Sequence, residues 1–181
     1  MDLTIEIWYS SKWVINMFQI ESGAVSPAEL KTAAALFYKQ LSADPVFRAA
    51  FPDPALGRSH CRSFVDAYGQ EGEIHRVYED GSLVAAALWS LPGRSVPSPT
   101  WDFRPEEPCC KLYLMVSRRP GAGSALLSYA EARFGDSRLV TLCGTARQAA
   151  YFRRRGFTES GRTSFGTILI REKDCTRPDG D

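Results

Sequence analysis

The stretch RRPGAGS at residues 118–124 decides the fold of this chain, together with the segments on either side of it. LYLMV (112–116) before it is typical of a buried strand, and ALLSYAE (125–131) after it is typical of a helix. A strand that turns through glycines into a helix presents backbone N–H groups at the helix N-terminus, where the helix dipole also favours an anion. Arg118 and Arg119 add positive charge that suits phosphate oxygens. The stretch therefore predicts a phosphate-binding turn.

Two common phosphate-binding motifs do not fit this turn. The loop of nucleoside triphosphatases has a lysine after its last glycine, whereas Ser124 follows Gly123 here. The dinucleotide-binding motif needs a third glycine at the position of Leu126. What remains is the pattern R-x-x-G-x-G, formed by Arg118, Gly121 and Gly123. Because so short a pattern also arises by chance, its meaning depends on the segments around it.

The composition favours one globular domain. The chain has 181 residues, of which 44% are hydrophobic and 24% charged, so it can bury one sizeable core. Its net charge of +1 argues against a large basic face for nucleic acid, and no apolar run is long enough to cross a membrane. The N-terminal residues lack the basic start of a secretion signal, so we expect a cytoplasmic protein. The five cysteines form no C-x-x-C pair, and neither a disulfide framework nor a metal site is predicted.

Helical and strand-like segments alternate along the chain and predict an α/β (α+β) domain around one sheet. Ser26 and Glu29 form a capping box for the first helix, Asp80-Gly81 is a hairpin turn, and Gly156 stands where a left-handed helix cap is expected. In chain order, the predicted elements are a helix from residue 27 that ends before Asp44-Pro45, a helix at 59–68, strands at 74–78, 83–88 and 110–116, a helix to about 134, a strand at 138–142, a helix at 146–155 and a strand at 165–171.

Residues 92–108 contain five prolines and predict a long loop. Loops of this length often carry function, so this one is a candidate wall of a substrate site, with Trp101 and Phe103 as apolar contacts. The alternative is that these two aromatic side chains only hold the loop against the body of the domain.

Four further segments in order, at residues 41–53, 85–93, 112–116 and 149–157, join the glycine turn in a resemblance to a known family. The chain resembles the GNAT superfamily of acyl-CoA-dependent N-acetyltransferases, whose cofactor motif is R/Q-x-x-G-x-G/A. We therefore expect one acetyltransferase-like domain at residues 17–173 and a flexible tail at 174–181. Residues 1–16 lie outside the family pattern. They are either an added edge strand, indicated by the alternation of Leu3, Ile5 and Ile7, or leader sequence.

The resemblance implies a mixed, mostly antiparallel central sheet that is flanked by helices and contains a splayed pair of central strands. Acetyl-CoA is then expected between the splayed strands, with its pyrophosphate over the backbone N–H groups of residues 119–124 and its pantetheine along residues 114–116. No metal is expected. The cofactor-binding residues implied are Leu114, Met115, Val116, Arg118, Arg119, Gly121, Ala122, Gly123 and Ser124.

The resemblance also implies a tyrosine that protonates the departing thiolate, at the position where this chain has Phe152. Tyr151 is its neighbour, turned by about 100° around the helix. Either a shift of the helix makes Tyr151 the general acid, or Tyr151 is a packed aromatic residue and water protonates the thiolate. Candidates for a general base have no diagnostic spacing, and we expect the histidine to be partly buried and the glutamates to be solvated. They are Glu73, His75, Glu79, Glu106 and Glu107.

The glycine turn departs from the family pattern, because only residues 117–120 separate the strand from Gly121 and Pro120 lacks a backbone donor. These two departures are expected to weaken cofactor binding. The favoured prediction is an enzyme, monomeric or homodimeric, that transfers an acetyl group from acetyl-CoA to a primary amine of a small molecule or peptide. The alternative is a catalytically degenerate module that binds acyl-CoA or a partner. A third hypothesis is nucleic-acid binding through the arginines at residues 153–155 and 162. A solvated helix end explains these arginines more simply.

Overall fold

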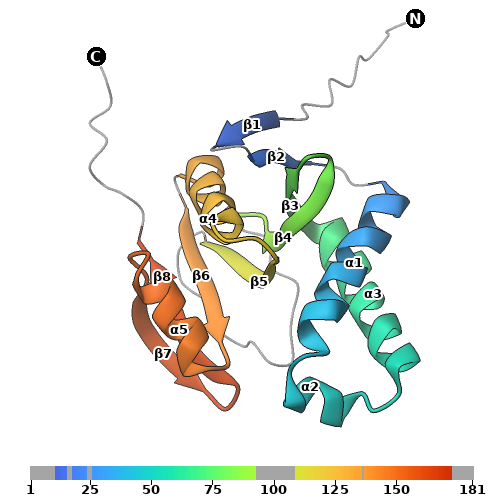
Figure 1. Ribbon diagram of the computed structural model, residues 1–181. Helices are drawn as coiled ribbons and strands as arrows, with labels where there is room; N and C mark the ends of the chain where they lie inside the picture. Colours follow the sequence, from blue (N-terminus) through green and yellow to red (C-terminus); the bar gives the residue numbers. More distant parts are fainter. Residues whose placement is uncertain (1–10, 16–17, 24–25, 93–108, 136, 173–181) are drawn as a thin grey trace, which may run out of the picture.

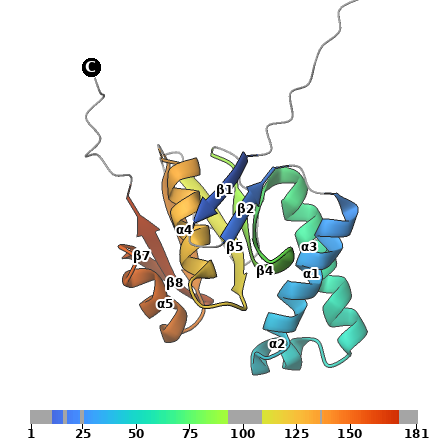
Figure 2. The same ribbon diagram turned by 45° about the horizontal axis from the view of Figure 1, so that its top comes forward.

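The computed structural model describes residues 11–15, 18–23, 26–92, 109–135 and 137–172. These residues form one eight-stranded sheet with helices on both faces (Figures 1 and 2). The strand order is β1-β2-β3-β4-β5-β6-β8-β7, and among the described strands only β5 and β6 pair in parallel. The predicted α/β (α+β) domain with a mixed, mostly antiparallel sheet is therefore confirmed.

The strands are β1 (Ser11–Ile15), β2 (Phe18–Ser22), β3 (Gly72–Glu79), β4 (Ser82–Ser90), β5 (Cys109–Ser117), β6 (Arg138–Cys143), β7 (Thr158–Thr163) and β8 (Gly166–Arg171). The helices are α1 (Pro27–Leu41), α2 (Pro45–Ala50), α3 (Pro54–Glu71), α4 (Ala122–Arg133) and α5 (Ala146–Arg153).

Two buried layers cover the two faces of the sheet. On one face, α1 and α3 pack against the strands, and Phe37 shares a cluster with Leu88 of β4. On the other face, α4 packs against the strands, and Leu126 shares a cluster with Ala87 of β4. Since adjacent residues of a strand point to opposite faces, the alternation along β4 separates the two layers. The long apolar strand β4 is thus buried on both sides, at the centre of the sheet.

The local signals that the sequence predicted are present at three places. Ser26 and Glu29 make both hydrogen bonds of the capping box at the start of α1. Asp80 and Gly81 form the hairpin turn between β3 and β4, with φ of +49° and +74°. Gly156, which follows α5, has φ of +81° and takes the left-handed conformation expected of it.

The predicted start of α3 is wrong. The helix begins at Pro54 and not at residue 59, because Asp53 caps it by accepting the Ala55 N–H at 2.8 Å. Gly57, which precedes the predicted start, lies inside the helix. A Cβ at Gly57 would come within 3.0 Å of Tyr38 Cε2 on α1, so the missing side chain lets the two helices pack closely.

Several elements were not predicted, and others end differently. The short helix α2 and the strands β2 and β7 have no counterpart among the predicted elements, and α5 ends at Arg153 and not at residue 155. The first 16 residues contain β1, which pairs with β2 at the edge of the sheet. Leu3, Ile5 and Ile7 lie outside the described residues, as do Trp101 and Phe103 of the proline-rich loop.

A buried ionic cluster joins β3 to the end of α4. Glu73 Oε1 lies 3.1 Å from His75 Nε2, and Glu73 Oε2 lies 3.2 Å from Arg133 Nη2. The Glu73 side chain is 7% exposed and His75 is fully buried, so the expectations of a solvated glutamate and a partly buried histidine are wrong here. Burial opposes ionisation of Glu73, but the hydrogen bond from His75 and the charge of Arg133 outweigh it and lower the pKa of the carboxyl to about 2. Burial lowers the pKa of His75, which is therefore neutral at pH 7.

We expect this cluster to make the protein lose stability in acid. A carboxyl whose pKa is lowered on folding stabilises the fold above its unfolded value of 4.5, by up to about 3 kcal/mol, and that stability is lost as the pH falls toward 2. His75 acts in the same direction, because the unfolded chain takes up a proton below pH 6.5 that the folded chain resists. Urea unfolding at several pH values measures the free energy of unfolding as a function of pH. This free energy should depend less on pH in Glu73→Gln than in the wild type. The control Glu172→Gln removes an exposed carboxylate that pairs with Arg138, and it should keep the wild-type profile. If the free energy of unfolding of Glu73→Gln fell as steeply with decreasing pH as that of the wild type, the expectation would be contradicted.

Candidate active site

The central strands β5 and β6 separate part-way along their length. Their parallel pairing ends at Leu112 and Thr141. Beyond this point β5 continues to Ser117 along β4, and β6 continues to Cys143 along β8. The edge of β5 that faces β6 at residues 113–117 thus keeps backbone groups that an extended ligand can pair with. This is the splayed pair of strands that the resemblance implies.

A β-bulge lies where the two strands separate. Leu88 of β4 pairs with Leu114, whereas Trp89 pairs with Leu112, so Tyr113 is an extra residue in β5. A bulge bends its strand and increases the local twist. The Tyr113 ring lies 4.4 Å from the ring of Tyr68 on α3, measured between centroids, so this side chain faces the α1 and α3 layer.

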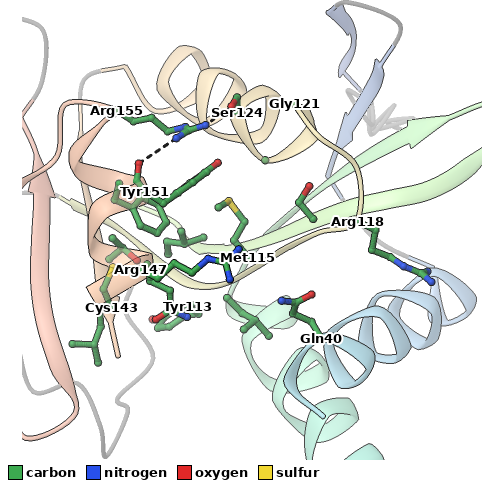
Figure 3. Close-up of a pocket in the computed structure, with 18 of the residues that line it drawn as sticks. Gln40, Tyr113, Met115, Arg118, Gly121, Ser124, Cys143, Arg147, Tyr151 and Arg155 are labelled. Atoms are coloured by element: carbon green, nitrogen blue, oxygen red, sulfur yellow. Dashed lines mark hydrogen bonds between the residues drawn. The ribbon is translucent and has the colours of Figure 1, made fainter. Parts of the chain in front are cut away.

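The gap between β5 and β6 opens into a cavity of about 620 Å³ (Figure 3). Its walls come from the separated strands, the glycine turn, the first turn of α4 and one face of α5. Of the predicted site residues, Leu114, Met115, Arg118, Arg119, Gly121, Gly123, Ser124 and Tyr151 line this cavity. Val116 and Ala122 do not line it and are buried in the two layers of the core.

The glycine turn between β5 and α4 has the geometry of an anion cradle. Gly121 is the N-cap of α4 with φ of +86°, a conformation in which a side chain is strained. The first helical hydrogen bond runs from the Ala125 N–H to the Gly121 carbonyl at 2.9 Å. The N–H groups of Gly123 and Ser124 precede this bond at the positive end of the helix. The Ala122 N–H instead points back to the Arg119 carbonyl at 3.3 Å.

The absence of a side chain at Gly123 keeps space open inside the cavity. A Cβ there would lie 2.9 Å from Tyr151 Oη and 3.5 Å from Ser117 Cβ. The Tyr151 hydroxyl is therefore close to the glycine turn, at the end of the cavity where β5 finishes.

Arg155 holds Tyr151 and Ser124 together. Its guanidinium carbon lies 3.6 Å from the centre of the Tyr151 ring, which is a cation–π contact. Its Nη1 donates to the Tyr151 carbonyl at 3.1 Å, and its Nη2 donates to Ser124 Oγ at 2.5 Å (Figure 3). Ser124 accepts this bond and so keeps its own proton for another acceptor. The interpretation of the arginines as a solvated helix end holds for Arg153 and Arg154, which are exposed, and is wrong for Arg155.

The Tyr151 hydroxyl is buried and makes no hydrogen bond to any of the described residues. Burial raises the pKa of this phenol, against the smaller lowering effect of the Arg155 charge, so the hydroxyl keeps its proton at neutral pH. Phe152 is only 6% exposed and packs against Phe157 with 5.2 Å between ring centroids. Tyr151 thus lines the cavity, and its buried hydroxyl lies against the glycine turn.

Positive charge surrounds the cavity, and the part of the lining that the structure describes contains no carboxylate. Arg119 Nε pairs with Glu79 at 2.6 Å outside the cavity. Arg118 is exposed beside the turn, and its backbone N–H donates to the Val84 carbonyl at 2.9 Å. Of the predicted general bases, Glu73 and His75 lie in the buried cluster described above, and Glu106 and Glu107 lie outside the described residues.

Comparison with known proteins identifies the fold. No protein-family model and no curated protein matches the sequence. The structure of an acetyltransferase of the GNAT family from Bacillus cereus is 16% identical, with a TM-score of 0.55 over 85% of this chain and 97% of that one. The chain has the GNAT fold.

Two further structures with the GNAT fold are similar. One is a histone acetyltransferase HPA2 and related acetyltransferase from Corynebacterium glutamicum, 22% identical, with a TM-score of 0.65 over 88% of this chain and 98% of that one. The other is AAC(6′)-Ib in complex with ribostamycin and coenzyme A, 13% identical, with a TM-score of 0.62 over 89% of this chain and 99% of that one. At these identities the similarity establishes the fold.

The described residues contain no group of three or more His, Cys, Asp and Glu side chains that could hold a metal ion. None of the described helices is long and apolar enough to cross a membrane.

Proposed function

We propose that the chain is an N-acetyltransferase that transfers an acetyl group from acetyl-CoA to a primary amine of a small molecule or peptide. The observation that carries this proposal is the cavity between β5 and β6, which combines an open strand edge with a glycine turn at a helix N-terminus. The structural neighbours include acetyltransferases, and AAC(6′)-Ib has coenzyme A bound.

The residues present fit coenzyme A in two respects. A Cβ at Gly123 would fill the cradle, and Tyr151, which lines the cavity, has a buried hydroxyl with no hydrogen-bond partner among the described residues. The N–H groups of Gly123 and Ser124 and the charge of Arg118 would hold the pyrophosphate. The edge of β5 at residues 114–116 would pair with the pantetheine amides, and the bound cofactor would supply the thioester.

The acetyl transfer also needs proton movement. At pH 7, freeing the lone pair of an amine with a pKa near 10.4 costs about 4.6 kcal/mol. The described cavity lining holds no carboxylate that could take this proton, and we propose water as the carrier. Tyr151 is the residue that we propose as general acid for the thiolate, because it lines the cavity and its hydroxyl is protonated and has no hydrogen-bond partner among the described residues.

Calorimetric titration with acetyl-CoA and with free coenzyme A tests the proposed function. We expect saturable binding of both, and thiol release from acetyl-CoA that depends on an added amine. Absence of binding at millimolar cofactor would contradict the proposal. The presence of Phe152 at the usual acid position favours one second candidate, a degenerate module that binds acyl-CoA. Tight binding without transfer to any amine would support that alternative.

A further inference from the structure

The charge inside the cavity restricts the kind of acceptor. Four arginines line it, and no acidic residue does so in the part of the chain that the structure describes. Two of the four are engaged, Arg119 by Glu79 and Arg155 by Ser124 and Tyr151. Arg118 stands at the glycine turn, where a phosphate is expected. Arg147 forms no ion pair with any of the described residues.

Arg147 comes from a different wall of the cavity. It lies in the first turn of α5, and Figure 3 shows its guanidinium pointing toward Met115 at the centre of the cavity, with Tyr113 nearby. Arg118 points away on the far side, beside α1. Arg147 is exposed. None of the ion pairs between described residues includes it. Its charge is thus available to a ligand in the part of the cavity away from the glycine turn.

The position of Arg147 does not serve the stability of α5. A cation in the first turn of a helix is repelled by the positive end of the helix dipole, and this first turn has no acidic residue to compensate. Thr145 and Gln148 already cap the helix reciprocally, with hydrogen bonds of 3.1 and 3.2 Å. The dipole and Arg147 therefore add their positive potentials on the same side of the cavity.

We propose that the acceptor is a small amine that also carries a carboxylate, and that Arg147 binds this carboxylate. The inference rests on the proposed acetyl transfer. The planar guanidinium fork matches a carboxylate with two parallel hydrogen bonds, whereas a polycationic acceptor meets repulsion from Arg147 and from the helix dipole. Fixing the carboxylate orients the amine, whose nitrogen attacks the thioester carbonyl carbon. The C–N bond forms, the C–S bond breaks with its electron pair on sulfur, the amine gives a proton to water and the thiolate takes one up.

A matched set of acceptors tests this inference on the full-length protein. The set consists of the common α-amino acids and β-alanine, the carboxamide of each, and the polycations spermidine and ribostamycin. We expect at least one amino acid to have a kcat/KM about 10-fold or more above that of its carboxamide, and both polycations to be poor acceptors. Preference for a carboxamide or a polycation would overturn the inference and leave the proposed function standing.

The variant Arg147→Gln tests the assigned residue. We expect its kcat/KM to fall about 10- to 100-fold for the amino acid and less than about 3-fold for the carboxamide, with an unchanged Kd for acetyl-CoA. Arg154→Gln is the matched control, because it removes an exposed arginine just beyond the same helix and outside the cavity. Weaker binding of acetyl-CoA by Arg147→Gln would assign this residue to the cofactor and overturn the inference. If wild-type protein bound no acetyl-CoA, the proposed function itself would fail, and the inference with it.

Discussion

Gly123→Val is expected to weaken binding of acetyl-CoA by about 100-fold or more, which corresponds to about 2.7 kcal/mol. The first added carbon would already lie 2.9 Å from Tyr151 Oη, and the other two would extend from it into the cradle. Tyr151 cannot move aside at low cost, because Arg155 stacks on one face of its ring and the ring of Phe152 stands edge-on at 5.2 Å. Calorimetric titration with coenzyme A measures the loss.

Two controls separate this local effect from a general loss of stability. Gly161→Val adds the same side chain on β7, where a Cβ would meet only Ile168 Cδ1 at 4.0 Å, and it should bind coenzyme A as the wild type does. Gly123→Ala should weaken binding less than Gly123→Val does. Adding Tyr151→Phe to Gly123→Ala removes the atom in conflict, so affinity should recover in the double variant. Equal affinities of Gly123→Val and wild type would mean that the turn does not hold the cofactor.

Much of the fold could be predicted from short sequence signals, because these act locally. The capping box at Ser26 and the glycine turn at residues 121–123 depend on a few adjacent residues. The strand β7 (TESGRT) could not be predicted, because it has no large apolar residue and forms by backbone pairing with β8 at the edge of the sheet. The helix α2 buries none of its residues and depends on the cap by Asp44, which accepts the Val46 N–H at 2.8 Å.

For the candidate site, the arrangement of the backbone could be predicted better than the contacts of the side chains. The open edge of β5 follows from the resemblance, whereas the role of Arg155 depends on a contact with Ser124 of another helix. One signal was available, since Tyr151 and Arg155 are four residues apart in the predicted helix 146–155, a spacing that favours stacking of a guanidinium on a ring. The buried state of Glu73 had no such signal, because its partner Arg133 is distant in sequence.

Tyr151→Phe is expected to lower kcat about 10- to 100-fold while the Kd for acetyl-CoA stays within about 3-fold. The loss is at the low end for a general acid, because a thiol with a pKa near 8.5 is a good leaving group even without one. The hydroxyl has no hydrogen-bond partner among the described residues, so removing it should not lower the melting temperature.

Tyr129→Phe is the matched control, because the buried Tyr129 hydroxyl lies 2.5 Å from Ser22 Oγ, away from the cavity. Its removal should lower stability by about 1 kcal/mol and leave kcat unchanged. Tyr151→Phe should thus lower kcat and keep stability, whereas Tyr129→Phe should lower stability and keep kcat. This contrast separates an effect on the reaction from an effect on folding. The hydroxyl of Tyr151 also lies close to Gly123, at the phosphate end of the cavity. A raised Kd with an unchanged kcat in Tyr151→Phe would therefore make Tyr151 a cofactor contact and assign protonation of the thiolate to water.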